Sequence, residues 1–502
     1  MRKLRAIIGL SLSGLIVASC TTGGTGGGGT GGNVAPVANA TATPATGTAP
    51  LTVALNSAGS TDSDGTIAGY NWNFGDGSAA STSANPSHVY SAVGSFTAFL
   101  TVTDNLGATG TSQVTITTTS GGGVTTTTAS TTTTTIPSAS SVTTVSGRQH
   151  TCALRSDGTV RCFGSNIFGQ LGDGTNTNRT TPVTVSGISG ATALSAGAYH
   201  TCAIVAGGVT KCWGSNSDGQ LGDGSTDSSN VAVTAFNLPA ASAVAAGGAH
   251  TCVVRVGGAA SCWGDNFSGQ LGTGSNSSAT TPRSVSGLNG VTSITAGDSH
   301  TCALRSTGAV ACWGDNFNGQ LGDGTLGAAN VPRTVSGLSN AASVQAGSGF
   351  TCARTNAGGV VCWGENIYGQ LGNGAILPPP PVAGDPPPTP INETSPVAVL
   401  NVSGAISLGV GNDHACAVIG GGTVRCWGRN TTGQLGDGAT VTRSTSAAVT
   451  SLTGATTVSG GEGHTCAARS AGQASCWGDN PSGQLGNGTT TSSNVPVSVT
   501  GL

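Results

Sequence analysis

Charged residues are scarce in this sequence of 502 residues, at 7 % of the total. Methionine occurs once, and aromatic residues make up 4 %. Because long helices depend on Leu, Glu, Lys, Ala and Met, this composition excludes a mainly helical protein. The 17 basic residues do not outnumber the 20 acidic ones, so there is no basic excess with which to hold a phosphate backbone. We therefore expect no nucleic-acid partner.

Glycine is abundant instead, with 84 residues, and Thr, Ser, Ala and Val fill much of the rest. These residues suit short strands and tight turns, which favours an all-β protein. At this length we expect more than one domain.

Residues 1–19 have the pattern of an export signal. Basic residues at the start precede an apolar run at 6–17, which is too short for a permanent transmembrane helix. The run ends in Val-Ala-Ser-Cys20, which resembles the lipobox of bacterial lipoproteins. The resemblance implies a bacterial source, lipidation of the Cys20 thiol, and a cell-envelope protein anchored at the outer membrane or cell surface. The alternative is an ordinary signal peptide followed by a chance cysteine.

Low-complexity stretches divide the rest of the chain. Residues 20–33 are rich in Gly and Thr, and residues 120–141 are rich in Thr, so both are predicted to be tethers. They separate a first domain at 34–119 from a second at 142–502.

The first domain has strand periodicity, because 51–55 and 96–104 alternate between apolar and polar residues. The stretches Asp62-Ser-Asp-Gly65, Tyr70-Asn-Trp-Asn-Phe-Gly-Asp-Gly77 and Leu100-Thr-Val-Thr-Asp104 resemble a polycystic kidney disease (PKD) domain. That family is an immunoglobulin-like β-sandwich, common in secreted bacterial proteins as a spacer or a carbohydrate-associated module.

Three aspartates of this domain are candidate ligands for a structural Ca²⁺, namely Asp62, Asp64 and Asp76. Hard cations bind clustered carboxylates on turns. The alternative is turn formation alone, because Asp-Gly pairs favour turns.

Seven copies of one phrase fill 142–502. Each copy reads His-Thr-Cys, nine residues, Cys-Trp-Gly, a short variable stretch with Asn, and Gly-Gln-Leu-Gly, with single departures such as Phe163 for Trp. The copies open at His150, His200, His250, His300, Phe350, His414 and His464. A period near 50 residues with strand signals predicts a propeller. The phrase resembles the regulator of chromosome condensation repeat, whose family fold is a seven-bladed β-propeller. The expected fold is therefore all-β, with a seven-bladed β-propeller preceded by an immunoglobulin-like β-sandwich.

Fourteen of the 15 cysteines recur in pairs ten residues apart. Two such cysteines face each other across a hairpin only if the turn has three residues, the last in the left-handed conformation that favours glycine. All seven repeats have glycine there. In an exported protein this register predicts seven disulfides: Cys152–Cys162, Cys202–Cys212, Cys252–Cys262, Cys302–Cys312, Cys352–Cys362, Cys416–Cys426 and Cys466–Cys476. The competing interpretation, metal-binding Cys/His sites, does not match zinc-ligand spacing.

Strand direction places two variable segments at one face of the propeller. These are the turns before the histidines and the long loops with Gly-Gln-Leu-Gly, and blade five inserts extra residues there, within 376–396. Variable side chains on a uniform scaffold mark a binding surface. The predicted partner-binding residues are Phe168, Phe267, Phe317 and Tyr368. The alternative is that these rings fold back onto a neighbouring loop.

The repeated histidines also allow two interpretations. A ring of imidazoles around a channel offers metal ligands, but a residue that nearly every repeat carries is expected to be structural.

Three functions compete. The leading one is a non-catalytic, lipid-anchored scaffold whose propeller binds an extracellular or envelope protein or a glycan, with no cofactor beyond the structural Ca²⁺. The second is an extracellular enzyme, for instance one acting on polysaccharide, although no nucleophile beside a base and no phosphate loop supports it. The third follows from the repeat family, which includes a guanine-nucleotide exchange factor and an inhibitor of β-lactamases. An exported lipoprotein does not meet a nuclear GTPase, so exchange is not expected, whereas inhibition of a secreted enzyme stays open.

Overall fold

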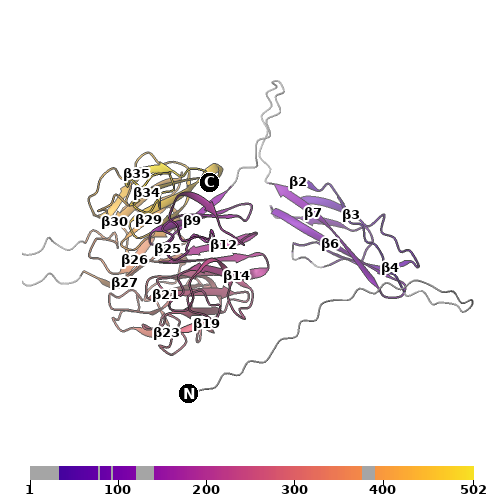
Figure 1. Ribbon diagram of the computed structural model, residues 1–502, viewed down its shortest axis with the longest axis horizontal. Helices are drawn as coiled ribbons and strands as arrows, with labels where there is room; N and C mark the ends of the chain where they lie inside the picture. The colour runs from indigo at the N-terminus through magenta and orange to yellow at the C-terminus, as the bar shows by residue number, and fades with distance from the viewer. Residues whose placement is uncertain (1–32, 77, 79, 92–93, 120–140, 376–390) are drawn as a thin grey trace, which may run out of the picture. The chain divides into compact units, whose positions relative to one another are not determined.

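The computed structural model describes residues 33–76, 78, 80–91, 94–119, 141–375 and 391–502 (Figure 1). The predicted signal, Cys20, almost all of both predicted tethers and most of the blade-five insertion lie outside these ranges. The chain divides into two compact units, with the boundary between Thr133 and Thr134. In the described ranges, no helix has the length and apolar character needed to cross a bilayer.

The first unit is a β-sandwich. One sheet has the strand order β1-β3-β5 and the other β2-β7-β6-β4. The strands are β1 (Thr41–Thr43), β2 (Thr46–Thr48), β3 (Leu51–Asn56), β4 (Ile67–Asn73), β5 (Ser87–Tyr90), β6 (Gly94–Asp104) and β7 (Thr109–Thr119). Trp72, Tyr90 and Leu100 are fully buried between the sheets. The predicted sandwich is confirmed.

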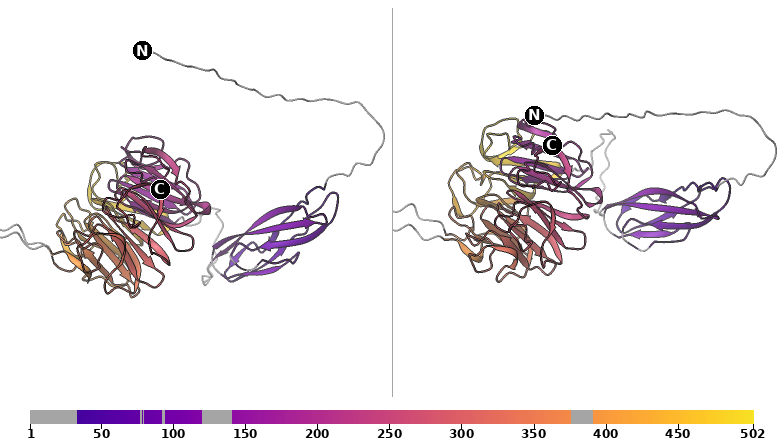
Figure 2. Two further views of the ribbon diagram at one scale, coloured as in Figure 1. Left: turned by 90° about the horizontal axis from the view of Figure 1, so that it is seen from below. Right: turned by 60° about the horizontal axis from the view of Figure 1, so that its bottom comes forward.

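The second unit consists of seven four-stranded antiparallel sheets, each built from one repeat. Figure 2 shows this ring of sheets from two further directions. The inner strands are β8 (Val142–Ser146), β12 (Ala191–Ala196), β16 (Ala241–Ala246), β20 (Val291–Ala296), β24 (Ala341–Ala346), β28 (Ala405–Val410) and β32 (Ala455–Gly460). The second strands are β9 (His150–Arg155), β13 (His200–Val205), β17 (His250–Arg255), β21 (His300–Arg305), β25 (Phe350–Thr355), β29 (His414–Ile419) and β33 (His464–Arg469).

The third and outer strands complete each blade. The third strands are β10 (Val160–Gly164), β14 (Val209–Gly214), β18 (Ala260–Gly264), β22 (Val310–Gly314), β26 (Val360–Gly364), β30 (Thr423–Gly428) and β34 (Gln473–Gly478). The outer strands are β11 (Arg179–Thr184), β15 (Ser229–Thr234), β19 (Ala279–Ser284), β23 (Ala329–Thr334), β27 (Glu393–Ala398), β31 (Arg443–Ala448) and β35 (Ser493–Ser498). Short 3₁₀ turns, η1 (Ala206–Gly208) and η2 (Ser470–Gly472), join the second and third strands of blades two and seven. The seven-bladed propeller is confirmed.

The cysteine hairpins have the predicted register. Cys152 pairs with Cys162 across β9 and β10, and Gly158 closes the turn with a φ of 75°. The other six hairpins repeat both features. The cysteines form the seven expected disulfides, with Cα atoms 4.1 Å apart in each pair. This short separation is typical of a non-hydrogen-bonded pair of facing residues.

Strand pairing also defines two faces of the propeller. In blade two, Ala196 pairs with Thr201 and Gly214 pairs with His200, so the turn before the histidine and the long loop leave the sheet at the same end. We call this end the loop face. The cysteine hairpin turns and the connections between blades lie at the other end, which we call the hairpin face.

Apolar packing joins each blade to the next. Leu171 of the first Gly-Gln-Leu-Gly loop packs with Cys152 of its own blade and Trp213 of the following blade, and all three are fully buried. Corresponding Leu and Trp residues fill five other spaces between blades, and Leu485 packs with Phe163 between blades seven and one. No strand is exchanged between blades seven and one, since β8 and β35 each belong to the sheet of their own repeat.

Candidate functional site

The repeated histidines hold neighbouring blades together. Each is fully buried, and its Nε2 lies 2.8–2.9 Å from a threonine Oγ1 of the next blade. The pairs are His150–Thr201, His200–Thr251, His250–Thr301, His300–Thr351, His414–Thr465 and His464–Thr151. The last pair closes the ring between blades seven and one. The remaining interface has Phe350 opposite Ala415, so both partners of the hydrogen bond are replaced together.

The threonines fix which imidazole nitrogen carries the proton. Thr201 donates its only hydroxyl proton to the backbone carbonyl of Gln170, at 3.0 Å, so His150 Nε2 must donate to Thr201 Oγ1. The same carbonyl accepts from Trp213 Nε1 at 2.9 Å. Burial lowers the pKa of His150 to about 4. The histidines are therefore neutral donors, and within the described residues no group of three or more His, Cys, Asp or Glu is placed to hold a metal ion.

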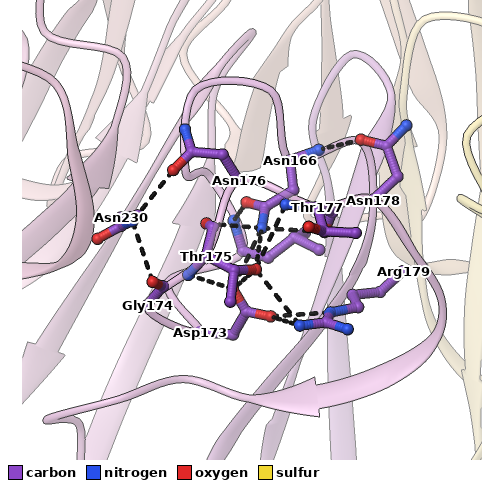
Figure 3. Close-up of polar contacts among 10 residues, drawn as sticks. Asn166, Asp173, Gly174, Thr175, Asn176, Thr177, Asn178, Arg179 and Asn230 are labelled. Carbon is purple, nitrogen blue, oxygen red and sulfur yellow. Dashed lines mark hydrogen bonds and ion pairs between the residues drawn. The ribbon is translucent and has the colours of Figure 1, made fainter.

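The repeated asparagine of each long loop is structural too (Figure 3). Asn166 Nδ2 donates to the backbone oxygens of Thr175 and Thr177, at 2.9 and 3.2 Å, while its Oδ1 accepts from the backbone N–H of Leu171 at 2.9 Å. Asp173 also accepts a hydrogen bond from the Asn166 side-chain amide, and it forms an ion pair with Arg179. Although partial burial alone raises the pKa of Asp173, hydrogen bonds from Thr175 and Arg179 lower it.

A second contact in the same figure joins two blades through their loops. Asn230 Nδ2, at the start of the outer strand of blade two, donates to Gly174 O and Asn176 Oδ1 in the loop of blade one. The repeated residues are thus engaged in building the propeller. The non-repeated side chains of the loop face are left as candidates for binding.

One cluster of non-repeated side chains lies at the centre of the loop face. Arg148 of blade one forms a 3.0 Å ion pair with Asp298 of blade four, and Ser348 of blade five donates to the same carboxylate at 2.7 Å. The Arg148 guanidinium also lies 5.6 Å from the centre of the Tyr199 ring. Because these residues come from separate blades, the cluster ties several blades together at this end.

The cluster borders a channel between the inner strands, with a volume of about 360 Å³. Its wall consists mainly of Gly, Ala, Ser and Thr, and both Arg148 and Asp298 line it. Their ion pair spans the channel at its loop-face end.

A second cluster joins blades five and six. Asp413 pairs with Arg429 at 3.1 Å, and the Arg429 guanidinium lies 5.2 Å from the centre of the Tyr368 ring. Burial, followed by repulsion from Asp413, raises the pKa of Glu365. Burial also raises the pKa of Asp413, although the bond from Arg429 opposes this effect.

The four predicted partner-binding aromatics divide into two kinds. Phe267 and Phe317, at one repeat position of blades three and four, project into solvent with 85 % and 81 % of their surfaces exposed. Phe168 packs edge-on against Tyr199, with ring centres 5.3 Å apart, and Tyr368 lies under Arg429. The first two match the geometry of partner anchors, and the last two match the alternative of packing between loops.

The Arg148–Asp298 contact was not predictable from the sequence, because its partners lie 150 positions apart and occur once each. The sequence did contain one indication. Arg148 and Asp298 both stand two residues before a repeated histidine, a position at which only blade seven has another charged residue, Glu462.

In the sandwich, Asp62, Asp64 and Asp76 have different surroundings. Asp76 lies 2.6 Å from His88 Nε2, and although burial alone raises the pKa of Asp76, hydrogen bonds from His88 and Ser78 lower it to about 2. Asp64 accepts from the backbone N–H of Val34. Both oxygens of Asp62 are buried without a hydrogen-bond partner. An orphaned carboxylate of this kind fits a hard cation, but the described residues do not bring the three aspartates together as one ligand group.

The comparisons with known proteins agree with this architecture. Residues 231–502 match the RCC1-like domain family, and regulator of chromosome condensation (RCC1) repeats match at 142–170, 157–204 and 191–220. Residues 33–120 match a PKD domain. The crystal structure of human WBSCR16 superimposes with a TM-score of 0.59, at 20 % identity over 68 % of this chain and 94 % of that one. Identity at that level establishes the fold alone.

The sandwich is similar to segments of bacterial proteases. It is 45 % identical over 65 residues to collagenase ColQ1 of Bacillus cereus, and 49 % identical over 57 residues to pre-pro-metalloprotease PrtV of Vibrio cholerae. These segments cover 13 % and 11 % of this chain, but only 7 % and 6 % of the two proteases. Together with seven disulfides, this similarity indicates an extracellular protein. The chain belongs to the RCC1-like domain family, with a PKD domain preceding its propeller.

Proposed function

We propose that this protein is a non-catalytic binding scaffold of the bacterial cell envelope, anchored by a lipid on Cys20. Its propeller binds an extracellular or envelope protein or a glycan on the loop face, and the PKD domain serves as a spacer. The proposal rests chiefly on the exposure of Phe267 and Phe317, 85 % and 81 %, on a scaffold whose repeated side chains are engaged elsewhere. Exposed aromatic rings on a rigid frame are typical anchors for a partner.

The state of the nucleophiles and bases supports a role without catalysis. The 14 cysteines of the propeller are bonded in disulfides. Its six histidines are buried and donate their Nε2 protons to threonines. The loop face therefore carries no imidazole base in its described part.

The loop face also constrains the chemistry of the partner. Four blades carry a carboxylate directly after Cys-Trp-Gly: Asp265, Asp315, Glu365 and Asp479. A partner with basic groups around an apolar patch complements this surface.

The binding role is tested by capture from cell envelope and culture medium. The double variant Phe267→Ser/Phe317→Ser should weaken capture of the partner by at least roughly 30-fold, since the loss of even one buried aromatic anchor costs about 2 kcal/mol or more. Its melting temperature should not change, because both rings are exposed. Thr307→Lys in a hairpin turn is the control. Loss of capture in that control, with normal capture by the double variant, would assign binding to the opposite face.

The anchor is tested separately by cell fractionation. After a high-salt wash, Cys20→Ser should be released from the membrane fraction while the wild type stays bound, and the mature N-terminus of the wild type should carry a lipid. Equal membrane association of wild type and variant, with no lipid found, would refute the anchor.

A further inference from the structure

Charge divides unevenly between the two faces of the propeller. The seven hairpin turns and the six connections between blades contain a single charged residue, Asp157. Basic residues flank these turns in the strands. Five stand at or next to the end of a second strand: Arg155, Arg255, Arg305, Arg354 and Arg469. Three stand near the start of a third strand: Arg161, Lys211 and Arg425. The hairpin face is therefore basic, whereas carboxylates such as Asp265 and Asp315 make the loop face acidic.

The two faces also differ in how many of their cations are paired with carboxylates. Five ion pairs join arginines to carboxylates that lie in the long loops or before the second strands: Arg148–Asp298, Arg179–Asp173, Arg333–Asp323, Arg429–Asp413 and Arg443–Asp437. At the hairpin turns, the described residues form one ion pair, Arg155–Asp157, at 3.6 Å. Arg255 and Arg305 form none, and the Nε atom of each is buried without a hydrogen-bond partner. Among the described residues, no carboxylate lies within ion-pair distance of either guanidinium.

Exposed apolar side chains accompany these cations. Val256, at the tip of the turn after Arg255, is 71 % exposed, and Phe236, in the connection between β15 and β16, is 55 % exposed. A hydrogen bond of 2.8 Å from Val256 N to Ala240 O joins the turn to that connection. We name Lys211, Phe236, Arg255, Val256 and Arg305 the hairpin patch. Cations beside exposed apolar groups are typical of surfaces that bind the interface of an anionic bilayer.

Both ends of the described propeller lie at the hairpin face. Val142, the first residue of β8, pairs with Arg155 at the hairpin face, so the first strand of the propeller begins there. The end of the chain lies at the same face, since Arg161 donates to Gly501 O.

We propose that the hairpin face docks on an anionic phospholipid surface through the cations and exposed apolar side chains of the hairpin patch. Phosphate headgroups compensate the guanidinium and ammonium charges, and Phe236 and Val256 enter the boundary between headgroups and acyl chains. The acidic loop face is repelled by the same surface, so the propeller binds in one orientation with its loops turned away.

The test is vesicle flotation of the full chain carrying Cys20→Ser, which removes any acyl anchor. Vesicles of phosphatidylglycerol and phosphatidylcholine are compared with vesicles of phosphatidylcholine alone. In this background Lys211→Gln/Arg255→Gln should reduce partitioning to the anionic vesicles about 25-fold at low salt, since each surface cation contributes about fivefold. High salt should reduce partitioning of the parent protein as well. The basic leader is present in every variant, so its contribution cancels.

Two further variants test whether a loss of vesicle binding results from unfolding or from the change in net charge. Val256→Ser at the exposed turn should also weaken partitioning while the melting temperature stays constant. Arg333→Gln/Arg443→Gln removes the same charge from cations already paired with carboxylates, and it should leave partitioning within twofold. Equal losses in this control and in the patch variant would overturn the proposal. So would unchanged flotation of the patch variant accompanied by loss of binding to a soluble anionic polysaccharide.

Discussion

The interface between blades five and six lacks the His–Thr hydrogen bond. Phe350 stands at the histidine position and Ala415 at the threonine position. A buried N–H group without an acceptor costs about 1–3 kcal/mol. Replacing only the threonine would leave the imidazole in that state, whereas a phenyl ring makes no such demand. The joint replacement indicates that the two positions are coupled energetically.

This coupling predicts the outcome of a substitution at the preceding interface. Thr351→Ala alone should lower the free energy of unfolding by about 1–3 kcal/mol, because His300 Nε2 loses its acceptor. Adding His300→Phe, which copies the natural Phe–Ala pair, should restore part of the loss. Urea unfolding of the wild type, both single variants and the double variant measures the coupling. Strictly additive effects would show that the bond does not couple the positions.

Asp62 yields a prediction for the sandwich. If its orphaned carboxylate holds Ca²⁺, adding Ca²⁺ should raise the melting temperature of the PKD domain, and a chelator should reverse the effect. Asp62→Asn should abolish the calcium-dependent shift. Asp76→Asn should keep it, since Asp76 is engaged with His88. Calorimetry with and without Ca²⁺ measures the shifts, and a shift that survives Asp62→Asn would exclude this ligand.

At the scale of one element, the cysteine hairpin is a closed local unit. Its disulfide removes conformational freedom from the unfolded chain, and the chain-entropy estimate for a loop of this size is roughly 2.5–3 kcal/mol. Residual hairpin structure in the unfolded chain reduces that figure.

Cys302→Ala/Cys312→Ala should therefore lower the free energy of unfolding of the oxidised protein by about 1–3 kcal/mol. Under reducing conditions the variant and the wild type should become similar in stability. Thiol labelling of native oxidised propeller should find no free cysteine among its 14, since all are paired. Peptide mapping that linked cysteines of different blades would contradict the hairpin register.

The hairpin also shows why part of the structure was predictable from sequence. The spacing of Cys152 and Cys162 and the glycine at 158 are local and recur seven times, so they define a turn, a register and a bond. The threonine partner of His150 lies 51 positions away, in another blade. Its only sequence signal was the joint change to Phe350 and Ala415.

Contacts that occur once were beyond prediction for a different reason. The ion pair between Arg148 and Asp298 spans blades one and four, and the bond of Asp76 to His88 crosses a turn of the sandwich. Neither repeats, so no periodicity points to the partner. The exposure of Phe267 and the packing of Phe168 depend on what the next loop presents, which a motif does not specify.

At the scale of the whole propeller, the histidines make stability depend on pH. Burial lowers their folded-state pKa values to about 3 or about 4, below the ordinary value of 6.5. Between these values the unfolded chain binds protons that the folded chain excludes, so stability is fully present above about pH 6.5 and falls as the pH drops toward 4. Each histidine contributes a slope of up to about 1.4 kcal/mol per pH unit.

Denaturation at pH 7, 5.5 and 4.5 should therefore show a steep loss of stability in acid. The variant His300→Phe/Thr351→Ala has one buried imidazole fewer. The slope of its free energy of unfolding against pH should therefore be smaller by up to about 1.4 kcal/mol per pH unit. Equal stability at pH 7 and pH 4.5 would contradict neutral, proton-excluding histidines.

Each sheet of the propeller comes from one repeat, and blades seven and one meet through side-chain contacts and loop backbone hydrogen bonds rather than a shared strand. In such a ring, any connection between blades is an equivalent position for the ends of the chain. Joining its present ends at the hairpin face and opening the chain in another connection between blades gives a circular permutant with the same contacts. A whole repeat is equally a complete unit for gene duplication or loss, so the loop face is able to gain new side chains by exchange of entire blades.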